Sequence, residues 1–364
     1  MRVLVTGHEG YLGSVLVPVL LDAGHEVVGL DTGYYATGTL GPVPQPVPTL
    51  RVDLRDVTVE TLAPVGADAV IHLAALCNDP LGNLDPDLTY EVNHRATIRL
   101  AQAAKQAGAT RFLFSSSCSL YGGPNTSDGG RGAGADDSPL DEQAGFNPLT
   151  PYGESKILSE RDLAPLADDH FTPVYLRNAT AYGFSPRLRG DLVVNDLVGH
   201  ALLTGEVKLR SDGMAWRPLV HVEDISAAFL ALLTAPRDAI HNRAFNIGQT
   251  SENYLIRDVA ELVADLVGGT VTYTPGSGAD ARNYRVSCDL IAHQVPTFRP
   301  QWTVAKGIEQ LVEYYRRYAL HLDDLMGERH QRLKRINTLH TTGALDNQLR
   351  WTTNPYSADE EPLP

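Results

Sequence analysis

The chain has 364 residues, 43% of them hydrophobic, and a formal net charge of −14. This length allows one large or two smaller domains with a sizeable core. The acidic balance and the lack of a basic stripe argue against a nucleic-acid partner, because nothing is present to neutralise phosphates. Cys77, Cys118 and Cys288 show neither a paired nor a metal-binding spacing, so we expect a reducing cytoplasmic location and no metal site.

The amino-terminal residues predict a nucleotide-binding turn. A β-rich run over 2–6 is followed by Gly7, Gly10 and Gly13, and then by apolar residues at helical spacing. Glycines at these positions allow a tight turn and a close approach of the backbone to a pyrophosphate. The helix that follows offers unpaired N–H groups and the positive end of its dipole. The chain also enters this strand directly, without a secretion signal, and has no run of 18 apolar residues, so we expect no membrane partner.

Asp31 indicates which dinucleotide is bound. It ends a second β-rich run over 25–30 and lies 18 residues after Gly13. A carboxylate at this place accepts hydrogen bonds from the ribose hydroxyls and repels a 2′-phosphate. We therefore expect the cofactor to be NAD and not NADP.

The remainder of the chain alternates strands with helices, which predicts an α/β fold. This alternation favours a doubly wound parallel sheet of the Rossmann type, with a smaller C-terminal substrate-binding domain. Further strands are expected over 49–54, 69–75, 111–114 and 173–177, and helices over 87–107 and 152–166.

The domain boundaries follow from this pattern. We expect residues 1–183 to form the NAD-binding domain, with 218–248 returning to it. Residues 184–217 and 249–320 would form the substrate-binding domain. Residues 321–364 read as a C-terminal extension without recognisable chemistry, and its last residues as disordered.

Tyr152 and Lys156 form a candidate general base. They are four residues apart on a predicted helix, so their side chains share one face, and the ammonium is expected to lower the phenol pKa from about 10. Ser117, at the end of a predicted strand, would share the proton that moves. The alternatives are a solvated helix face for Tyr152 and Lys156 and a turn-forming role for Ser117. The glycine turn at the amino terminus makes both alternatives less favoured.

Other candidates for cofactor contact lie at strand ends. Asp53 would meet the adenine amino group or, alternatively, cap a helix. Asn93 would contact the cofactor or, alternatively, make a core hydrogen bond. The candidate cofactor-binding residues are Gly7, Gly10, Tyr11, Leu12, Gly13, Asp31, Asp53, Leu54, Leu73, Ala74, Ala75, Asn93, Ser115, Tyr152 and Lys156.

Together these motifs resemble the extended short-chain dehydrogenase/reductase family, in its nucleotide-sugar epimerase and dehydratase branch with the UDP-glucose 4-epimerase-like enzymes. The runs over 176–183 and 217–224 add to a likeness that spans roughly residues 1–318. The resemblance implies that Ser117, Tyr152 and Lys156 are catalytic, and that the chain forms a homodimer through its helices over 87–107 and 152–166. It also implies a nucleotide-sugar site made of Ser117, Cys118, Asn178, Thr180, Asn195, Arg217 and Arg282.

Departures from the family pattern narrow the reaction. Cys118 and Ser119 stand where 4,6-dehydratases carry an Asp-Glu pair, and the decarboxylases have Glu at the position of Ser119. The acid or base cysteine of 3,5-epimerases would also align with Ser119, so Cys118 reads as a packed small residue. Thr180 replaces an Asn of the 4-epimerases, and Cys77 a Lys near the cofactor in some of them. These changes leave the sugar open.

The resulting hypothesis is an NAD-dependent nucleotide-sugar epimerase that works at C4 through a transient 4-keto sugar. A ketoreductase or dehydratase, and a non-catalytic NAD-binding regulatory protein, are the alternatives. The Gly-rich segment over 123–147 is expected to be a loop between Ser117 and Tyr152, acting as a lid or as a plain surface insertion.

Overall fold

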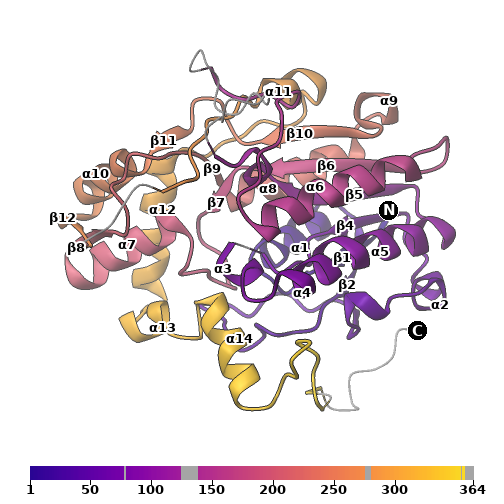
Figure 1. Ribbon diagram of the computed structural model, residues 1–364, viewed down its shortest axis with the longest axis horizontal. Coiled ribbons are helices and arrows are strands. Elements are labelled where there is room, and N and C mark those ends of the chain that lie inside the picture. The colour runs from indigo at the N-terminus through magenta and orange to yellow at the C-terminus, as the bar shows by residue number, and fades with distance from the viewer. Residues whose placement is uncertain (78, 124–137, 275–279, 354, 357–364) are drawn as a thin grey trace.

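A seven-stranded parallel sheet lies at the centre of the computed structural model, which describes residues 1–364 except 78, 124–137, 275–279, 354 and 357–364 (Figure 1). Its strand order is β10-β6-β5-β4-β1-β2-β3, and the chain changes direction across the sheet between β1 and β4. This is the predicted doubly wound Rossmann fold, and the prediction is confirmed. The strands are β1 (Arg2–Thr6), β2 (Glu26–Leu30), β3 (Thr49–Leu50), β4 (Ala69–His72), β5 (Arg111–Ser117), β6 (Thr172–Asn178) and β10 (Arg243–Ile247).

Helices cover both faces of the sheet, which explains the unbroken apolar runs in its central strands. On β1, Val3 and Val5 join a core with α1 (Gly13–Asp22) and α8 (Val222–Thr234), whereas Leu4 points into a second core with α5 (Ala96–Gln106). Side chains alternate between the faces of a strand, so one short run serves both cores.

The two long helices that the sequence predicts are segmented. The helix expected over 87–107 consists of α4 (Pro86–Tyr90), a π-helical turn (Glu91–Arg95) and α5. The helix expected over 152–166 is α6 (Pro151–Leu163), followed by a 3₁₀ turn. Shorter helices lie around the sheet, namely α2 (Val59–Leu62), α3 (Asp79–Gly82), α9 (Arg237–Ile240) and α11 (Asp289–Gln294).

A second lobe packs over the carboxyl ends of the strands and has its own hydrophobic core (Figure 1). It contains a three-stranded sheet, in which β9 lies between β7 and β11, and a separate parallel pair formed by β8 and β12. These elements are β7 (Thr180–Tyr182), β8 (Glu206–Leu209), β9 (Trp216–His221), β11 (Asn253–Leu255), β12 (Thr270–Tyr273), α7 (Val193–Thr204), α10 (Ile256–Val267) and α12 (Val304–Arg317).

The C-terminal residues fold back against the first lobe. After α13 (Leu322–Met326), helix α14 (Arg332–Thr341) places Ile336 and Leu339 in a small core with Leu76 and Leu81. Helix α14 runs below α3 and α4 in Figure 1. The extension is therefore a packed part of the fold.

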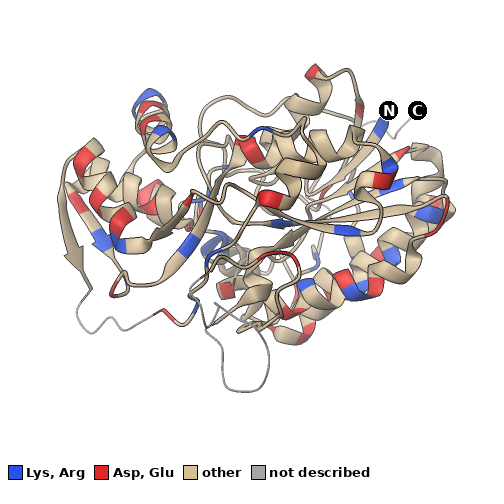
Figure 2. Cartoon of the chain, turned by 90° about the horizontal axis from the view of Figure 1, so that it is seen from above, with Lys and Arg blue, Asp and Glu red and all other residues tan. Residues whose placement is uncertain are grey.

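Charged residues of both signs alternate along the outer helices (Figure 2). In the described part of the chain, no helix is both long and apolar enough to cross a membrane. Most of the segment proposed as a lid, residues 124–137, lies outside the described residues, and so do residues 357–364 of the tail predicted to be disordered.

Candidate active site

A cavity of about 1010 Å³ opens between the two lobes, at the carboxyl ends of the parallel strands. Ligands of doubly wound folds bind in this position. Among the predicted site residues, its wall includes Gly7, Gly10, Tyr11, Leu12, Asp31, Asp53, Leu54, Leu73, Ala74, Ala75, Ser115, Ser117, Tyr152, Lys156, Asn178, Thr180, Arg217 and Arg282.

The glycine turn after β1 is too closely packed for a side chain at two of its positions. Gly7 adopts a φ of +71°, and a Cβ built there would lie 2.8 Å from the backbone nitrogen of Ala74. A Cβ on Gly13 would lie 2.4 Å from the carbonyl oxygen of Gly7. Glycine is therefore required at both positions by steric space. Gly13 serves the packing of α1 against the turn and does not line the cavity.

The acidic residues at the strand ends differ in role. Asp31 accepts hydrogen bonds from the backbone nitrogens of Glu9, at 3.1 Å, and Gly33, at 2.8 Å, and burial raises the pKa of its carboxyl group. Asp53 caps a 3₁₀ turn by accepting from the nitrogen of Arg55 at 2.9 Å, and it forms an ion pair with that guanidinium at 2.6 Å. The alternative role foreseen for Asp53, a helix cap, is thus present, while the residue also lines the cavity.

Asn93 and Asn195 support the wall from behind. Asn93 is 1% exposed, accepts a hydrogen bond from the nitrogen of Leu76 at 2.8 Å and donates to its carbonyl oxygen at 3.1 Å. The alternative of a core hydrogen bond therefore describes Asn93, because both ends of its amide are occupied. Asn195 accepts from the nitrogen of Gly183 at 2.9 Å and donates to the carbonyl oxygen of Arg189 at 3.1 Å. Its amide fixes the loop after β7 and is not directed at a substrate.

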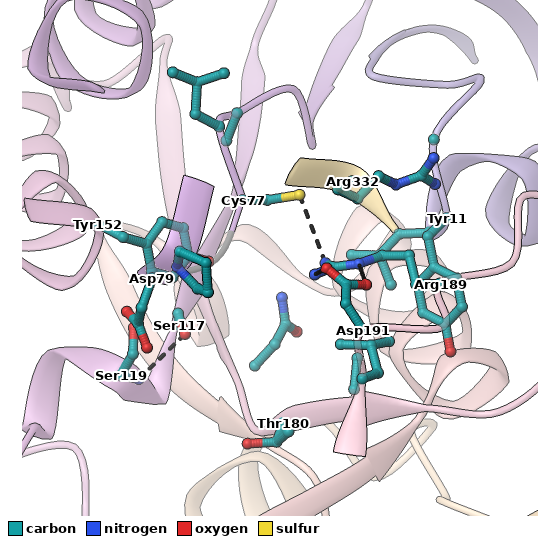
Figure 3. A pocket seen from close by; sticks show the side chains of 18 of the residues that line it. Tyr11, Cys77, Asp79, Ser117, Ser119, Tyr152, Thr180, Arg189, Asp191 and Arg332 are labelled. Carbon is teal, nitrogen blue, oxygen red and sulfur yellow. Dashed lines mark hydrogen bonds and ion pairs between the residues drawn. The ribbon is translucent and has the colours of Figure 1, made fainter. Parts of the chain in front are cut away.

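Ser117, Tyr152 and Lys156 come together in the cavity, as predicted. Ser117 ends β5, and its hydroxyl oxygen accepts a hydrogen bond from the backbone nitrogen of Ser119 at 3.1 Å (Figure 3), while its side chain lies near enough to the Tyr152 phenol to lower the phenol pKa in part. Helix α6 presents Tyr152 in its first turn, because Thr150 caps the helix by accepting a hydrogen bond from the nitrogen of Gly153 at 3.2 Å. One turn later, Lys156 lies with its Nζ 5.6 Å from the centre of the tyrosine ring.

The predicted lowering of the Tyr152 pKa is wrong for this structure. Burial is the largest effect and raises the pKa of the phenol, while the hydrogen bond with Ser117 lowers it in part. The Lys156 ammonium donates to the carbonyl oxygen of Ser115 at 2.7 Å, and burial lowers the pKa of this lysine to about 8. Burial in the cavity therefore disfavours the charged form of both groups.

The two arginines expected at the nucleotide diphosphate are already paired with carboxylates. Arg217 forms an ion pair with Asp280 at 2.6 Å. Arg282 binds Asp280 at 2.9 Å and Asp79 of α3 at 2.6 Å. Two guanidinium groups therefore face two carboxylates, and an entering diphosphate has to compete with Asp79 and Asp280.

Cys118 lies outside the cavity wall. It is 1% exposed, its thiol donates to the carbonyl oxygen of Arg177 at 3.1 Å, and burial raises the thiol pKa. A buried thiol of this kind is unreactive. The inclusion of Cys118 among the substrate contacts is therefore wrong, and it is the packed small residue that the alternative described.

Ser119 is a wall residue that the predicted set lacks. Among the described residues, its hydroxyl oxygen is shielded from solvent and has no hydrogen-bond partner, and the same is true of the amide oxygen of Asn178 in this wall. Unpaired buried acceptors are costly, which makes both atoms suited to a polar ligand. A signal was available in the sequence, because the resemblance to the family already placed Ser119 where it implies a Glu in decarboxylases and a cysteine in 3,5-epimerases.

A second set of residues absent from the prediction lies on the opposite side of the cavity, beside Tyr11 (Figure 3). Arg189 forms a two-pronged ion pair with Asp191, at 2.9 Å for both contacts, and approaches the sulfur of Cys77 at 3.6 Å. Arg332 of α14 also lines the wall. Residues 321–364, in which the sequence shows no recognisable chemistry, thus supply a side chain to the cavity wall, because tertiary packing brings α14 there.

This fold and this site define a Rossmann enzyme that moves a hydride and a proton between a dinucleotide and a hydroxyl-bearing substrate. The glycine turn, Asp31 and the unpaired polar atoms fit NAD. Residues 3–248 match the model of the NAD dependent epimerase/dehydratase family, and the chain belongs to this family.

Known proteins agree with this assignment. The UDP-glucose 4-epimerase of Mycolicibacterium smegmatis is 31% identical over 330 residues, which cover 87% of this chain and 99% of the relative. The Thermus thermophilus UDP-glucose 4-epimerase, solved as a complex with NAD, has 28% identity and a TM-score of 0.71, covering 87% of this chain and 99% of that chain. MoeE5, solved with UDP-glucose and NAD, has 29% identity and a TM-score of 0.73, covering 88% and 100%. The predictions of NAD as cofactor and of a nucleotide-sugar epimerase are confirmed.

Proposed function

We propose that the protein inverts C4 of a UDP-linked hexose and interconverts UDP-glucose with its 4-epimer. The observation that carries this proposal is the meeting of Ser117, Tyr152 and Lys156 in one cavity with a dinucleotide turn. The similarity to UDP-glucose 4-epimerase over nearly the whole length of that relative supports the choice of substrate.

Each catalytic residue has a role that its position explains. In its deprotonated form Tyr152 accepts the proton of the C4 hydroxyl, and the Ser117 hydroxyl beside it holds the substrate oxygen near the phenol. The Lys156 Nζ lies 5.6 Å from the centre of the Tyr152 ring and donates a hydrogen bond to the carbonyl oxygen of Ser115 at 2.7 Å, which holds the ammonium beside the phenol. NAD, which the glycine turn and Asp31 would hold, would supply the hydride acceptor and donor for the sugar carbon.

The wall beside Ser117 favours epimerisation over elimination of water. Dehydration across C5 and C6 requires an acid and a base next to the catalytic hydroxyl. Here Cys118 is buried behind the wall, and Ser119 presents a neutral hydroxyl. Residues 118 and 119 therefore supply no carboxylate that could promote elimination of water from a 4-keto intermediate.

The test uses UDP-glucose that carries deuterium at C4, with no added cofactor. We expect the 4-epimer to form with the deuterium retained, as followed by mass spectrometry and proton NMR. A requirement for added NADH or NADPH would show a ketoreductase, loss of water would show a dehydratase, and bound NAD without turnover of any nucleotide sugar would show a regulatory protein.

Replacing Tyr152 with Phe tests the base directly. Turnover is expected to fall by roughly 10²- to 10⁴-fold, the usual contribution of a positioned proton-transfer group, while bound NAD is retained. The matched control is Tyr90→Phe, because the Tyr90 hydroxyl donates to Glu154 of the same helix at 2.6 Å but lies outside the cavity wall. Equal turnover in both variants would remove Tyr152 from the mechanism.

A cytoplasmic location and a homodimer complete the proposal. The dimer would use the surface formed by α4, α5 and α6, which pack side by side on one face of the central sheet. Sedimentation of the purified protein at micromolar concentration would measure its mass, and a monomer would contradict this assembly.

A further inference from the structure

Helix α14 brings a buried positive charge to the cofactor side of the cavity. Arg332, its first residue, is 2% exposed and lines the cavity wall. Its guanidinium lies 3.9 Å from the centre of the Tyr35 ring and donates to the carbonyl oxygen of Arg187 at 3.1 Å. Among the described residues, no carboxylate forms an ion pair with Arg332. A buried cation in this state is costly unless an anion joins it.

Arg332 belongs to an arginine cluster, which we define as Arg187, Arg189 and Arg332. Within the described part of the chain, the ion pair of this cluster is the one between Arg189 and Asp191. Arg187 is 6% exposed, and its Nε is buried without a hydrogen-bond partner. Burial lowers the pKa of both Arg187 and Arg332, while nearby carboxylates raise it in part, Glu9 and Asp31 for Arg187 and Asp191 for Arg332. The cluster thus has three guanidinium groups and, among the described residues, a single ion pair, that of Arg189 with Asp191.

The position of the cluster indicates the anion. Tyr11, in the glycine turn, has its phenol pKa raised by burial and lowered in part by Arg189 and Arg332, so both cations lie near the turn. Figure 3 shows Tyr11, Arg189 and Arg332 on the same side of the cavity, away from Tyr152 and Ser119. Tyr35, on which Arg332 stacks, follows Asp31 by four residues. The cluster therefore lies between the turn and the ribose-binding carboxylate, where the diphosphate of a dinucleotide lies in Rossmann folds.

The C-terminal extension holds Arg332 in this position. The indole nitrogen of Trp351 donates to the carbonyl oxygen of Thr32 at 2.7 Å, and Arg350 pairs with Asp56. The Tyr34 hydroxyl donates to the carbonyl oxygen of Leu349. These contacts with the loops after β2 and β3 fix the extension beside the part of the cavity that contains Asp31 and Asp53.

We propose that Arg332 binds the diphosphate of NAD, and that the C-terminal extension is the element that retains the cofactor. The proposal rests on the NAD dependence of the family and not on the sugar or the carbon proposed above. Arginine suits this contact, because its planar fork can donate two hydrogen bonds to phosphate oxygens.

The experiment compares Arg332→Gln with wild type by titrating cofactor-free protein with NAD and with UDP. We expect the Kd for NAD to rise about tenfold or more, as for loss of a charge-assisted hydrogen bond, and the Kd for UDP to stay within about twofold. The matched control is Arg317→Gln, which removes the same charge at an exposed residue of α12 outside the wall of this cavity and should bind NAD as wild type does. The variant Arg332→Lys, which keeps the charge, should lose less affinity.

Two results would overturn the proposal. One is an unchanged affinity of Arg332→Gln for NAD, and the other is a weaker affinity for UDP with NAD unaffected, which would place Arg332 at the substrate. Failure of the wild type to bind NAD would overturn the proposed function instead.

A second measurement on the wild type covers the case in which Arg332→Gln does not fold. Amide hydrogen exchange across 332–341 should slow when ADP-ribose is added, and should not change with adenosine, which lacks the diphosphate. Equal exchange with and without ADP-ribose would contradict the role of Arg332.

Discussion

At the scale of single residues, the chemistry of the wall depends on which side chains face the cavity. Cys118 and Ser119 are neighbours in the sequence, yet the thiol lies in the core and the hydroxyl lies in the wall. A 3₁₀ turn, capped by Ser117, begins at Cys118 and sets this difference. Two adjacent residues can thus differ in their access to a substrate, because one side chain faces the core and the next faces the cavity.

Replacing Cys118 with Ala should leave turnover within about twofold of wild type and lower the stability by about 1 kcal/mol, since only buried packing and one weak hydrogen bond are lost. Steady-state kinetics and urea unfolding measure the two effects. A loss of turnover above tenfold in a folded variant would instead indicate thiol chemistry.

Replacing Ser119 with Ala should raise KM for the nucleotide sugar several-fold and change kcat little. Its hydroxyl has no partner of its own in the wall, so a substrate hydroxyl can use it for binding. Cys118→Ala is the control, because it lies in the same 3₁₀ turn but outside the cavity wall. An unaltered KM in Ser119→Ala would show that Ser119 does not bind the substrate.

At the scale of elements, the turn between β1 and α1 is the most constrained part of the cofactor site. Gly7 lies in this turn and Gly24 lies just after α1, and both have positive φ, at +71° and +79°. They differ in surroundings, because a Cβ on Gly7 meets the backbone of Ala74 while a Cβ on Gly24 meets nothing within 4 Å. Substitutions at these two glycines therefore distinguish the effect of backbone strain, which both share, from the effect of a steric clash, which only Gly7 has.

Gly7→Ala should lose bound NAD, and Gly24→Ala should keep it. Both substitutions strain the backbone by roughly 1 kcal/mol, but the one at Gly7 also pushes the turn away from β4. The NAD released on denaturation, measured per protein chain, distinguishes the variants. Full NAD content in a folded Gly7→Ala would show that the turn tolerates a side chain.

Elements whose signal is local could be predicted from the sequence, and those set by tertiary contacts could not. The glycine turn, β5 and the first turn of α6 each carry their own cues, in glycine spacing, apolar runs and a capping threonine. The strand expected over 49–54 is shorter, because Asp53 already caps a 3₁₀ turn and β3 ends at Leu50. The loss of pairing there follows from local hydrogen bonds that a β-rich pattern does not reveal.

The site shows the same division. Tyr152 and Lys156 share a helix, so their spacing alone brings them together. Arg189 and Arg332 are far apart in the sequence, and they meet only because α14 packs on the loop after β4. No motif marks Arg332, since its role arises from burial next to Tyr35.

At the scale of the whole molecule, buried histidines tie stability to pH. His72 lies in β4 between two threonines, at 2.6 Å from Thr6 and 2.8 Å from Thr97, and burial lowers its pKa to about 3. Because the unfolded chain binds this proton near pH 6.5, stability is complete above that pH and is lost as the pH falls toward 3.

His72→Gln should reduce this acid sensitivity. At pH 5 the wild-type histidine accounts for a loss of roughly 2 kcal/mol relative to pH 7, and the variant lacks that share. Urea unfolding at the two pH values measures it, with the exposed His321→Gln as the control that should behave as wild type. The same loss in His72→Gln and wild type would contradict this assignment.

The location of α14 places the catalytic groups and the proposed retention of the coenzyme in different parts of the chain. The family match ends at residue 248, and the helix that reaches the dinucleotide side starts at Arg332. Two homologues alike through the matched region, but with different tails, would share their chemistry while exchanging coenzyme at different rates. Evolution can adjust the residence time of the coenzyme here by altering the tail and leaving the reacting groups untouched.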